Sequence, residues 1–385
     1  MGGASSTILP MLSGKESSAW VSLTRAPALG ISSLVRALGL FESAEGILEA
    51  SDASRRLAGI SAAAREFLSS ARAATTVAER AWLEDPRHHV VPFTDPRYPA
   101  SLRAAKRPPL ALYVDGNAEA LNDPQLAIVG SRNPTAQGRD TAHDFAEYLA
   151  CRGLAILSGL AIGIDSAAHR GALAAQGTTL AVLGSGVDVV YPASNRGLAV
   201  EIRPRGALVS AFPLGTPPRR ENFPRRNALI AGLSLGTLVV EAARGSGSLI
   251  TARLAAALER KVFAIPGSIH SSLSGGCHEL IRRGASLTET AHDILSELNF
   301  SAFSAPPPQA PADHYAPIQH ELPMDKEPKI LLDALGFDPA DLDALVVRTG
   351  LKAEAVSSMM LILELEGHVQ AAPGGRYSRV VRSRR

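Results

Sequence analysis

The alternation of short apolar runs with helical segments constrains this chain more than any other feature of its sequence. The apolar runs are bounded by glycine and cover 126–130, 154–158, 179–184, 207–211, 237–241 and 261–266. The helical patterns between and after them cover about 137–151, 165–176, 194–203, 224–233, 249–260 and 276–283. Strands that are apolar throughout, rather than at every second residue, are typical of a parallel sheet covered on both faces. The pattern predicts an α/β fold with a doubly wound, mostly parallel, Rossmann-like sheet, with two further strands at 89–93 and 110–114.

The N-terminal part has a different pattern. Residues 16–80 show short helical periods broken by glycines, so a small helical domain of the SAM or helix-hairpin-helix type is expected over 1–84. The stretch 26–30 resembles the hairpin of helix-hairpin-helix modules, whose backbone amides can hold a phosphate. Ala28 stands where such hairpins usually carry a glycine. A purely structural helical bundle is the favoured alternative.

The C-terminal part indicates a further domain. Residues 301–328 contain seven prolines and no clear period, which predicts a linker after a Rossmann-like domain at 85–300. Residues 329–385 predict helices, a turn and two short strands, at 329–335, 339–348, 349–350, about 352–366, 369–371 and 377–380. This order of helix-turn-helix and small β-wing is that of a winged-helix domain.

Composition excludes several classes of protein. The 39 Lys+Arg and 37 Asp+Glu residues leave a net charge of +2, so any basic surface must be local. Cys151 and Cys277 are the two cysteines and form no CxxC pattern, which excludes a disulfide scaffold and a cysteine-rich zinc module. No apolar run approaches the ~18 residues of a membrane span, and the first residues lack the order of a signal peptide. We expect a cytoplasmic protein without a membrane partner.

Loops rich in glycine and hydroxyl groups follow several of the predicted strands. They contain Gly130, Ser131, Arg132, Ser158, Gly159, Gly184, Gly186, Gly245, Ser246, Gly247 and Ser248. Open α/β sheets place ligands at the carboxyl ends of their strands, glycine lets a ligand approach the backbone, and helix N-termini offer free amides. Each loop alone is more easily explained as an ordinary turn, but several side by side favour a phosphate-binding surface.

The segment 203–226 indicates what kind of ligand carries the phosphate. It carries six arginines against one acid, Glu221, and the motif that includes Arg220, Phe223, Arg225, Arg226 and Asn227 lies at its end. Cations track a phosphate backbone, an aromatic face stacks on an unpaired base, and asparagine can contact a base edge. The alternative is a solvated charged loop with Phe223 in the core.

Other chemistries have weak support. The dinucleotide pattern GxGxxG and the phosphate-loop lysine are absent, so no cofactor is expected. Residues 232–236 match the nucleophile pattern GxSxG, but a helix precedes and a strand follows, the reverse of what that nucleophile needs. Asp165 and His169 lie four residues apart without a third ligand, and we interpret Asp165 as a helix cap. We expect no catalytic residue and no metal.

Taken together, the motifs resemble the DNA-processing protein A family (DprA, also called Smf). The resemblance covers about 125–290 and runs through the segments 129–132, 158–165, 168–169, 191–195, 223–227, 230–234, 246–252 and 262–267, together with Glu241. It implies a protein that binds single-stranded DNA during natural transformation, protects it and loads the RecA recombinase. It also implies a homodimer that is not known as an enzyme, with helical and winged-helix domains on either side. The sequence departs from the family at Ala211, Ala228 and His278.

These observations lead to one preferred function and one alternative. The preferred function is a non-enzymatic recombination mediator that binds single-stranded DNA through the residues of the glycine loops and the arginine segment. The alternative is a nucleotide-cleaving phosphoribohydrolase on a related fold, although the residues around Glu241 lack the glycine-rich pattern of such enzymes. For the winged helix we expect a protein-contacting role, because 338–368 carries six acids against Arg348 and Lys352.

Overall fold

The computed structural model describes residues 12–300, 327–336, 339–366, 368–372 and 374–380, and its centre is a nine-stranded sheet. From one edge to the other the strands are β1 (His88–Pro92), β2 (Ala111–Gly116), β6 (Ala207–Ser210), β5 (Thr179–Val182), β4 (Ala155–Ser158), β3 (Gln125–Val129), β7 (Gly236–Val239), β8 (Lys261–Ala264) and β9 (Ser286–Leu287). Neighbouring strands from β6 to β9 are parallel, and β1 and β2 add to that sheet in antiparallel orientation. The mostly parallel sheet predicted from the sequence is confirmed.

Helices cover both faces of this sheet because consecutive strand residues point to opposite sides. Leu126 and Ile128 of β3 pack in the cluster that includes helix residues Ala142 and Ile164, whereas Ala127 packs on the other face with the helix that carries Leu229 and Ile230. The helices of this layer structure are α8 (Ala136–Cys151), α9 (Ile164–Ala174), α10 (Arg196–Ile202), α11 (Asn222–Leu233), α12 (Ser248–Ala257), α13 (Gly275–Arg282) and α14 (Ala291–Glu297). The fold is therefore doubly wound, as the uninterrupted apolar runs predict.

The order of the strands reverses beside β3. The chain leaves β3 towards β4, β5 and β6, and then returns to β7 on the other side of β3. Open α/β sheets bind ligands at such a reversal, outside the carboxyl ends of the strands. The loops that follow β3 and β7 begin at these ends, so the topology brings residues 130–135 and 240–248 to one place.

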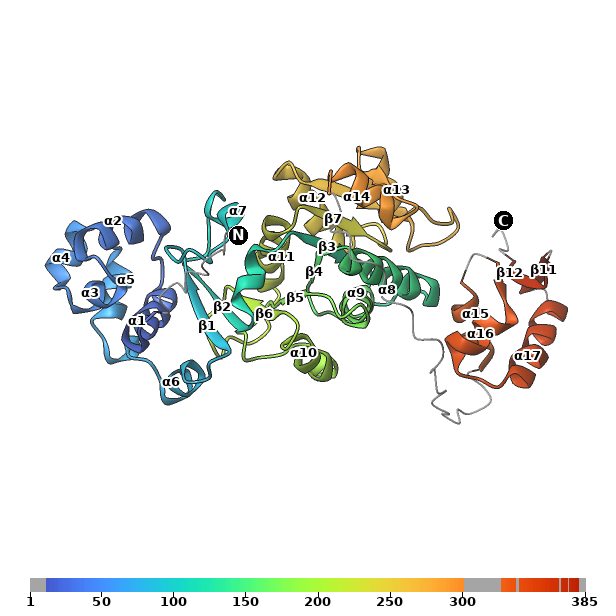
Figure 1. The fold of residues 1–385 in the computed structure, drawn as a ribbon, viewed down its shortest axis with the longest axis horizontal. Helices are drawn as coiled ribbons and strands as arrows, with labels where there is room; N and C mark the ends of the chain where they lie inside the picture. Colours follow the sequence, from blue (N-terminus) through green and yellow to red (C-terminus); the bar gives the residue numbers. More distant parts are fainter. Residues whose placement is uncertain (1–11, 301–326, 337–338, 367, 373, 381–385) are drawn as a thin grey trace, which may run out of the picture.

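Six α-helices form a bundle beside the antiparallel edge of the sheet (Figure 1). They are α1 (Gly14–Arg25), α2 (Ile31–Phe41), α3 (Ala44–Glu49), α4 (Asp52–Leu57), α5 (Ala62–Leu68) and α6 (Val77–Leu83). Trp20, Leu34 and Ile47 are fully buried and share one apolar cluster with Val90 and Tyr113 of the sheet. The bundle therefore does not have a core separate from that of the sheet.

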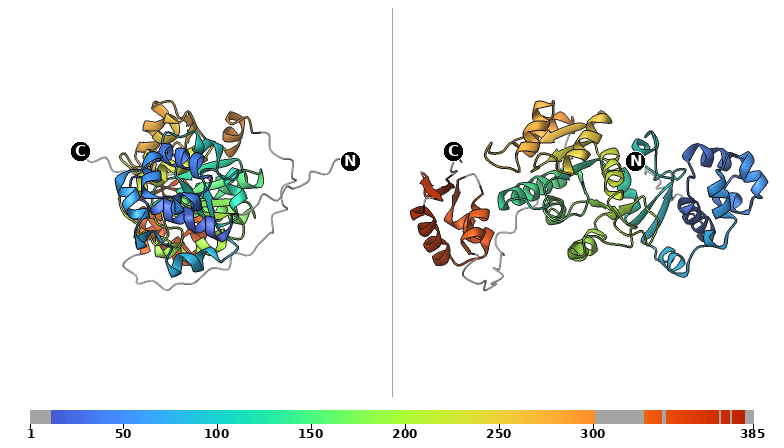
Figure 2. Two further views of the ribbon diagram at one scale, coloured as in Figure 1. Left: turned by 90° about the vertical axis from the view of Figure 1, so that its left-hand side faces the viewer. Right: turned by 180° about the vertical axis from the view of Figure 1, so that it is seen from behind.

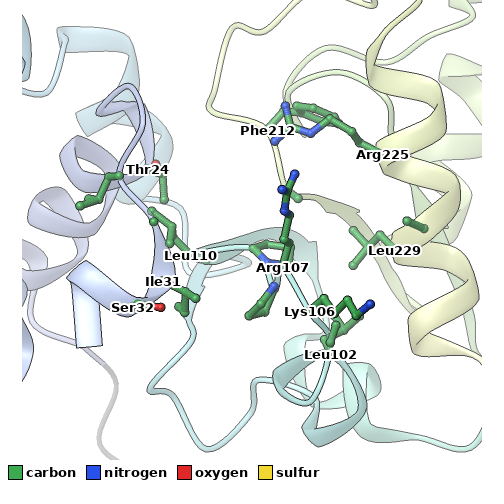
Figure 3. Close-up of a pocket in the computed structure, with 18 of the residues that line it drawn as sticks. Thr24, Ile31, Ser32, Leu102, Lys106, Arg107, Leu110, Phe212, Arg225 and Leu229 are labelled. Carbon is green, nitrogen blue, oxygen red and sulfur yellow. The ribbon is translucent and has the colours of Figure 1, made fainter. Parts of the chain in front are cut away.

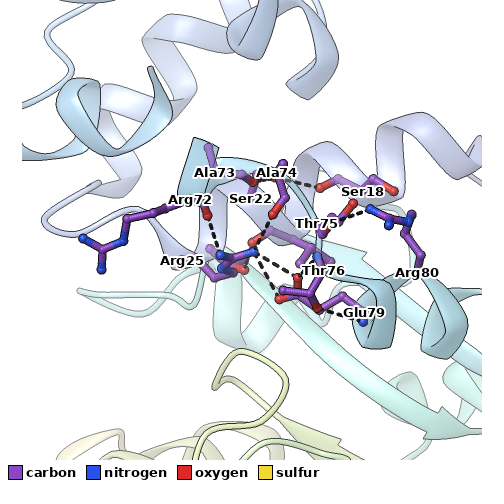
Figure 4. Close-up of polar contacts among 12 residues, drawn as sticks. Ser18, Ser22, Arg25, Arg72, Ala73, Ala74, Thr75, Thr76, Glu79 and Arg80 are labelled. Carbon is purple, nitrogen blue, oxygen red and sulfur yellow. Dashed lines mark hydrogen bonds and ion pairs between the residues drawn. The ribbon is translucent and has the colours of Figure 1, made fainter. Parts of the chain in front are cut away.

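Polar contacts close the bundle around the segment between α5 and α6 (Figure 4). The Arg25 guanidinium donates hydrogen bonds to the carbonyls of Arg72 and Ala74 and lies 3.0 Å from the Glu79 carboxylate. Glu79 also completes a capping box with Thr76 at the start of α6. These contacts fix α6, and with it the connection to β1, against α1.

The hairpin between α1 and α2 needs a left-handed backbone at the position where such hairpins usually carry glycine and this chain has Ala28. Ala28 adopts φ +54°, in the left-handed region that favours glycine. The hairpin is thus formed despite the missing glycine. Gly30 precedes α2 without a side-chain cap, which leaves the first amides of that helix without side-chain partners.

A winged helix forms the opposite end of the molecule (Figures 1 and 2). Its elements are α15 (Glu327–Leu335), β10 (Ala340–Asp341), α16 (Leu342–Thr349), α17 (Ala353–Leu365), β11 (Val369–Ala372) and β12 (Arg376–Arg379). The predicted helix-turn-helix and wing are confirmed, and β10 adds a third strand to the wing. Arg348 contacts α8 of the central domain through Asp140, with 3.0 Å between Nε and Oδ2.

Most of the predicted linker 301–328 lies outside the described residues. No helix in the described part of the chain combines the length and apolar character that crossing a bilayer requires.

Candidate nucleic-acid interface

A groove of about 860 Å³ lies at the reversal point of the sheet. The loops after β3 and β7 form two of its walls, and the first half of α11 forms another. Eleven of the residues predicted from the sequence line it: Gly130, Ser131, Arg132, Arg220, Phe223, Arg226, Asn227, Gly245, Ser246, Gly247 and Ser248. The structure thus brings together residues that are up to 118 positions apart in the chain.

The loop after β3 is held by its neighbours on two sides. Gly163 adopts φ +84°, and a Cβ at this position would lie 2.4 Å from the carbonyl oxygen of Ser131. The amide of Ile164 donates a hydrogen bond to the same carbonyl over 3.1 Å. On the other side, both oxygens of Glu241 accept hydrogen bonds from Thr135, at 2.9 Å from its amide and 2.7 Å from its hydroxyl. The loop is therefore fixed in position without any ligand.

Phe223 lies at the centre of a group of cations on the wall formed by α11. Its half-buried ring has the guanidinium carbon of Arg132 5.6 Å from its centroid and that of Arg226 at 5.8 Å. The Tyr191 ring lies 6.2 Å away, centroid to centroid. Gly184 packs against the same ring, since a Cβ there would come within 3.2 Å of it. Phe223 lines the groove and is not part of the described apolar clusters of the core.

Arg226 is a buried cation rather than an exposed one. Its residue exposure is 6%, and its Nη1 lies 4.0 Å from the Asp165 carboxylate. The side chain passes over Gly159, where a Cβ would lie 1.2 Å from Nη1. Burial lowers the pKa of the Arg226 guanidinium, and the Asp165 charge opposes that shift. Arg226 therefore stabilises the wall of the groove through the buried Asp165 carboxylate. The sequence pattern does not distinguish this structural role from a contact with phosphate.

Asp165 is not the helix cap that we expected. The cap position of α9 is Gly163, and Asp165 lies in the first turn of the helix. Its carboxylate instead accepts hydrogen bonds from the amides of Gly159 at 3.1 Å and Ala161 at 3.3 Å, in the loop before the helix. Burial raises its pKa, while the nearby Arg226 lowers it. The pair Asp165–Arg226 thus ties the loop after β4 to α11.

Three predicted contact residues do not reach the groove. Ser158 is fully buried and its hydroxyl donates a hydrogen bond to the carbonyl of Ile128 over 2.6 Å. Gly159 lies beneath Arg226, so the space that glycine opens is filled by protein and not by a ligand. Arg225 lies on another side of α11, where its guanidinium stacks on Phe212 at 5.2 Å. Ser158 and Gly159 shape the site, and Arg225 belongs to a different surface.

Three exposed arginines line the groove: Arg132, Arg220 and Arg244. Sequence reasoning missed Arg244, although its position directly before the predicted Gly245 loop was a usable signal. Asp165 is the one acid among the described residues that line the groove, and it is buried. The surface open to a ligand is therefore cationic.

The loop after β7 leads directly into α12, whose N-terminus faces the groove. Gly247 occupies the cap position and supplies no side-chain hydrogen bond. The amide group of Asn227 donates a hydrogen bond to the carbonyl of Gly247 over 3.4 Å, and the hydroxyls of Ser246 and Ser248 lie 2.8 Å apart. Asn227 is 9% exposed, so it positions this loop as well as lining the groove.

The groups that suggested metal or acid–base chemistry have structural partners. His169 is fully buried, its Nδ1 lies 2.7 Å from the Thr179 hydroxyl, and burial lowers its pKa to about 3. It is therefore neutral at pH 7. Among the described residues, one cluster has the spacing of metal ligands, and its members His143, Asp144 and Glu147 do not line the groove.

Comparison with known proteins finds one family across most of the chain. Residues 89–299 match the family described as DNA recombination-mediator protein A, and residues 303–375 match the DprA winged helix domain. Protein Smf of Escherichia coli K12 is 44% identical over 296 residues, which cover 76% of this chain and 78% of that protein. DNA processing protein DprA of Streptococcus pneumoniae is 44% identical over 206 residues, 54% of this chain and 73% of that protein.

Two solved structures are also similar. The crystal structure of DNA processing protein A from Streptococcus pneumoniae superimposes with a TM-score of 0.62 at 33% identity, covering 76% of this chain and 100% of that one. A structure of DNA processing protein A from Helicobacter pylori, described for its single-stranded DNA binding mode, has a TM-score of 0.50 at 29% identity. It covers 53% of this chain and 94% of that one.

Proposed function

We propose that this chain, which belongs to the DNA recombination-mediator protein A family, binds single-stranded DNA in the groove at the carboxyl ends of β3 and β7. The observation that carries the proposal is the charge of the groove, where Arg132, Arg220 and Arg244 are exposed and the one lining acid is buried. Such a surface attracts a phosphate backbone without reading its sequence. The Helicobacter pylori relative, whose structure is described for single-stranded DNA binding, supports the same substrate.

Stacking accounts for the preference for unpaired DNA. The half-buried Phe223 ring lies beside Arg132 and within the groove, where an unpaired base can stack on an aromatic face. In a duplex the bases are stacked on each other and present only their edges to a protein. A groove that combines exposed arginines with an accessible ring therefore favours the single strand.

We propose that the chain performs no catalysis. The acid on which the phosphoribohydrolase alternative depends is Glu241, and both of its carboxylate oxygens accept hydrogen bonds from Thr135. Glu241 does not line the groove. The test is incubation with nucleoside monophosphates: release of free base that is lost in Glu241→Gln would replace our proposal with the enzyme.

The wider role follows the family. We propose that the bound strand is protected and passed to the RecA recombinase during transformation, in the cytoplasm, and that the working unit is a homodimer. The winged helix supports a role in contacts with proteins, because α17 exposes Leu361, Ile362 and Leu365, which are 58%, 50% and 80% accessible. Light scattering that gives only monomer at micromolar concentrations would contradict the homodimer.

The binding proposal is tested by titrating labelled single- and double-stranded oligonucleotides over a range of salt concentrations. Cationic contacts to a single strand give a slope of about −0.7 per phosphate in a plot of log affinity against log salt. We expect tighter binding of the single strand and a steep slope. Equal affinities for both forms, or no dependence on salt, would contradict the proposal.

A further inference from the structure

A second cleft, of about 880 Å³, lies beside α11 and is separate from the groove described above (Figure 3). The hairpin before α2 borders it on one side and α11 on the other. The connection from α7 (Ala100–Arg103) to β2 forms part of its lining, and Arg107 stands in the opening between hairpin and helix. The cleft therefore joins the N-terminal bundle to the central domain.

The charge of this cleft has one sign. Lys106, Arg107, Arg225 and Arg226 line it, and no acidic residue does so in the described part of the chain. Lys106, Arg107 and Arg225 are exposed, and none of the three has a carboxylate within 4.0 Å among the described residues. Unpaired cations that line one cleft repel each other unless an anion lies between them. The cleft is thus suited to a polyanion.

Its remaining lining suits flat apolar groups. Leu29, Ile31, Leu110 and Leu229 contribute apolar surface, and Phe212 lies under the Arg225 guanidinium. Ala211 and Ala228 line this cleft as well and add apolar surface without charge.

Arg226 connects the cleft to the groove. It lines both, and it follows Arg225 on the same helix. Arg226 itself is buried, so the exposed cation that a strand leaving the groove past α11 reaches is the neighbouring Arg225. The first amides of α2, which lack a side-chain cap, also border the cleft and favour a negative charge.

We propose that this cleft binds a further stretch of the single-stranded DNA that occupies the groove, with phosphates on Lys106, Arg107 and Arg225 and bases against the apolar lining. This inference rests on the proposed function, and it assigns to the N-terminal bundle a part in DNA binding. The contribution of the cleft depends on the length of the DNA. OB folds that bind single strands cover about 4–16 nucleotides each, so we choose a strand of ~6 nucleotides to occupy the groove alone and one of ~20 to extend into the cleft.

The test compares two double variants on both lengths of oligonucleotide. Lys106→Glu/Arg107→Glu reverses two charges in the cleft. Arg36→Glu/Arg56→Glu reverses two exposed charges of the N-terminal bundle that line neither site, and serves as the matched control. We expect the cleft variant to weaken binding of the ~20-mer about tenfold or more beyond the control, and to lower its salt slope by about 1.4, for two phosphates at ~0.7 each. Binding of the ~6-mer should match that of the control.

The neutral variant Lys106→Gln/Arg107→Gln should show the same dependence on length with a smaller loss. If the cleft variant and the control weaken the ~20-mer equally, or if the loss is the same on the ~6-mer, the inference is wrong while binding in the groove stands. An equal loss on a duplex of the same length contradicts the single-strand assignment. If the wild type fails to bind the ~6-mer and Arg132→Ala changes nothing, the proposed function itself fails.

Discussion

The groove of the central domain and the winged helix differ in charge in a way that their folds do not predict. A winged helix is a fold associated with duplex DNA, read by its second helix in the major groove. Here the surface of α17 is acidic and apolar, with Glu354 and Leu365 exposed, and Arg348 of α16 is already paired with Asp140. The groove has three exposed arginines on a fold that binds many kinds of ligand. The two surfaces therefore show that the charge a surface carries is set by its own exposed residues and does not follow from the fold.

The largest expected effect contrasts the buried arginine of the groove with the surface arginine of the winged helix. Arg226→Met leaves Asp165 buried without a counter-charge and should lower the free energy of unfolding by about 3–5 kcal/mol. Arg348→Ala removes an ion pair whose Asp140 partner is half exposed and should cost no more than about 1 kcal/mol. Urea unfolding of both variants measures the difference. Equal losses would show that Arg226 is not a structural charge.

Next in size is the loss of two exposed cations of the groove. Arg132→Ala/Arg220→Ala should weaken binding of single-stranded DNA about 100-fold, because each charged contact contributes about 1.5 kcal/mol and 1.4 kcal/mol is tenfold. The loss should be similar on every sequence, and the salt slope should become flatter. Fluorescence anisotropy measures both. The control is Arg36→Ala/Arg56→Ala, and the assignment of the groove would be wrong if both pairs had the same effect.

A smaller effect separates stacking from charge. Phe223→Ala should cost about 1–3 kcal/mol of binding free energy and leave the salt slope nearly unchanged, because no phosphate contact is lost. Phe223→Tyr keeps an aromatic face and should retain most of the affinity. If Phe223→Ala unfolds the domain instead, as thermal denaturation would show, then this ring has the core role that was the alternative interpretation.

The smallest expected effect is that of removing the winged helix. A chain without residues 326–385 should keep its single-strand affinity within about threefold, because the acids of this domain offer little to phosphate at close range. The same titration on the shortened chain measures this, with circular dichroism to verify its fold. A large loss in a folded chain would show that the winged helix, and not the groove alone, binds the single strand.

The fold could be predicted closely because one physical signal recurs. Apolar runs marked β3 to β8 to within about two residues, since only strands buried on both faces need such runs. The strand β9 escaped because Ser286 and Leu287 form a two-residue edge strand that is not fully buried, which leaves no apolar period to detect. The prediction that Asp165 caps its helix is wrong. A carboxylate that caps a helix and one that binds a loop both accept hydrogen bonds from backbone amides, so the sequence alone does not separate them.

The site was predicted in its composition but not in its arrangement. Adjacent residues of a helix point about 100° apart, so the sequence could not show that Arg225 and Arg226 leave α11 towards different surroundings. Glycine at 159 correctly signalled a close approach. It could not show that the approaching group is Arg226 of the same chain rather than a phosphate.

The apolar cluster that the N-terminal helices share with β1 and β2 has a thermodynamic consequence. Leu23 and Tyr113 belong to one cluster, and the hydroxyls of Thr24 and Tyr113 lie 2.5 Å apart, so the helices and the sheet edge lose their contacts in the same event. The winged helix has a cluster of its own around Leu345 and Met360. A calorimetric scan should therefore resolve two transitions, a large one for the bundle and sheet together and a small one for the winged helix. We therefore expect the N-terminal helices to unfold with the sheet as one cooperative unit, and the winged helix to unfold as another.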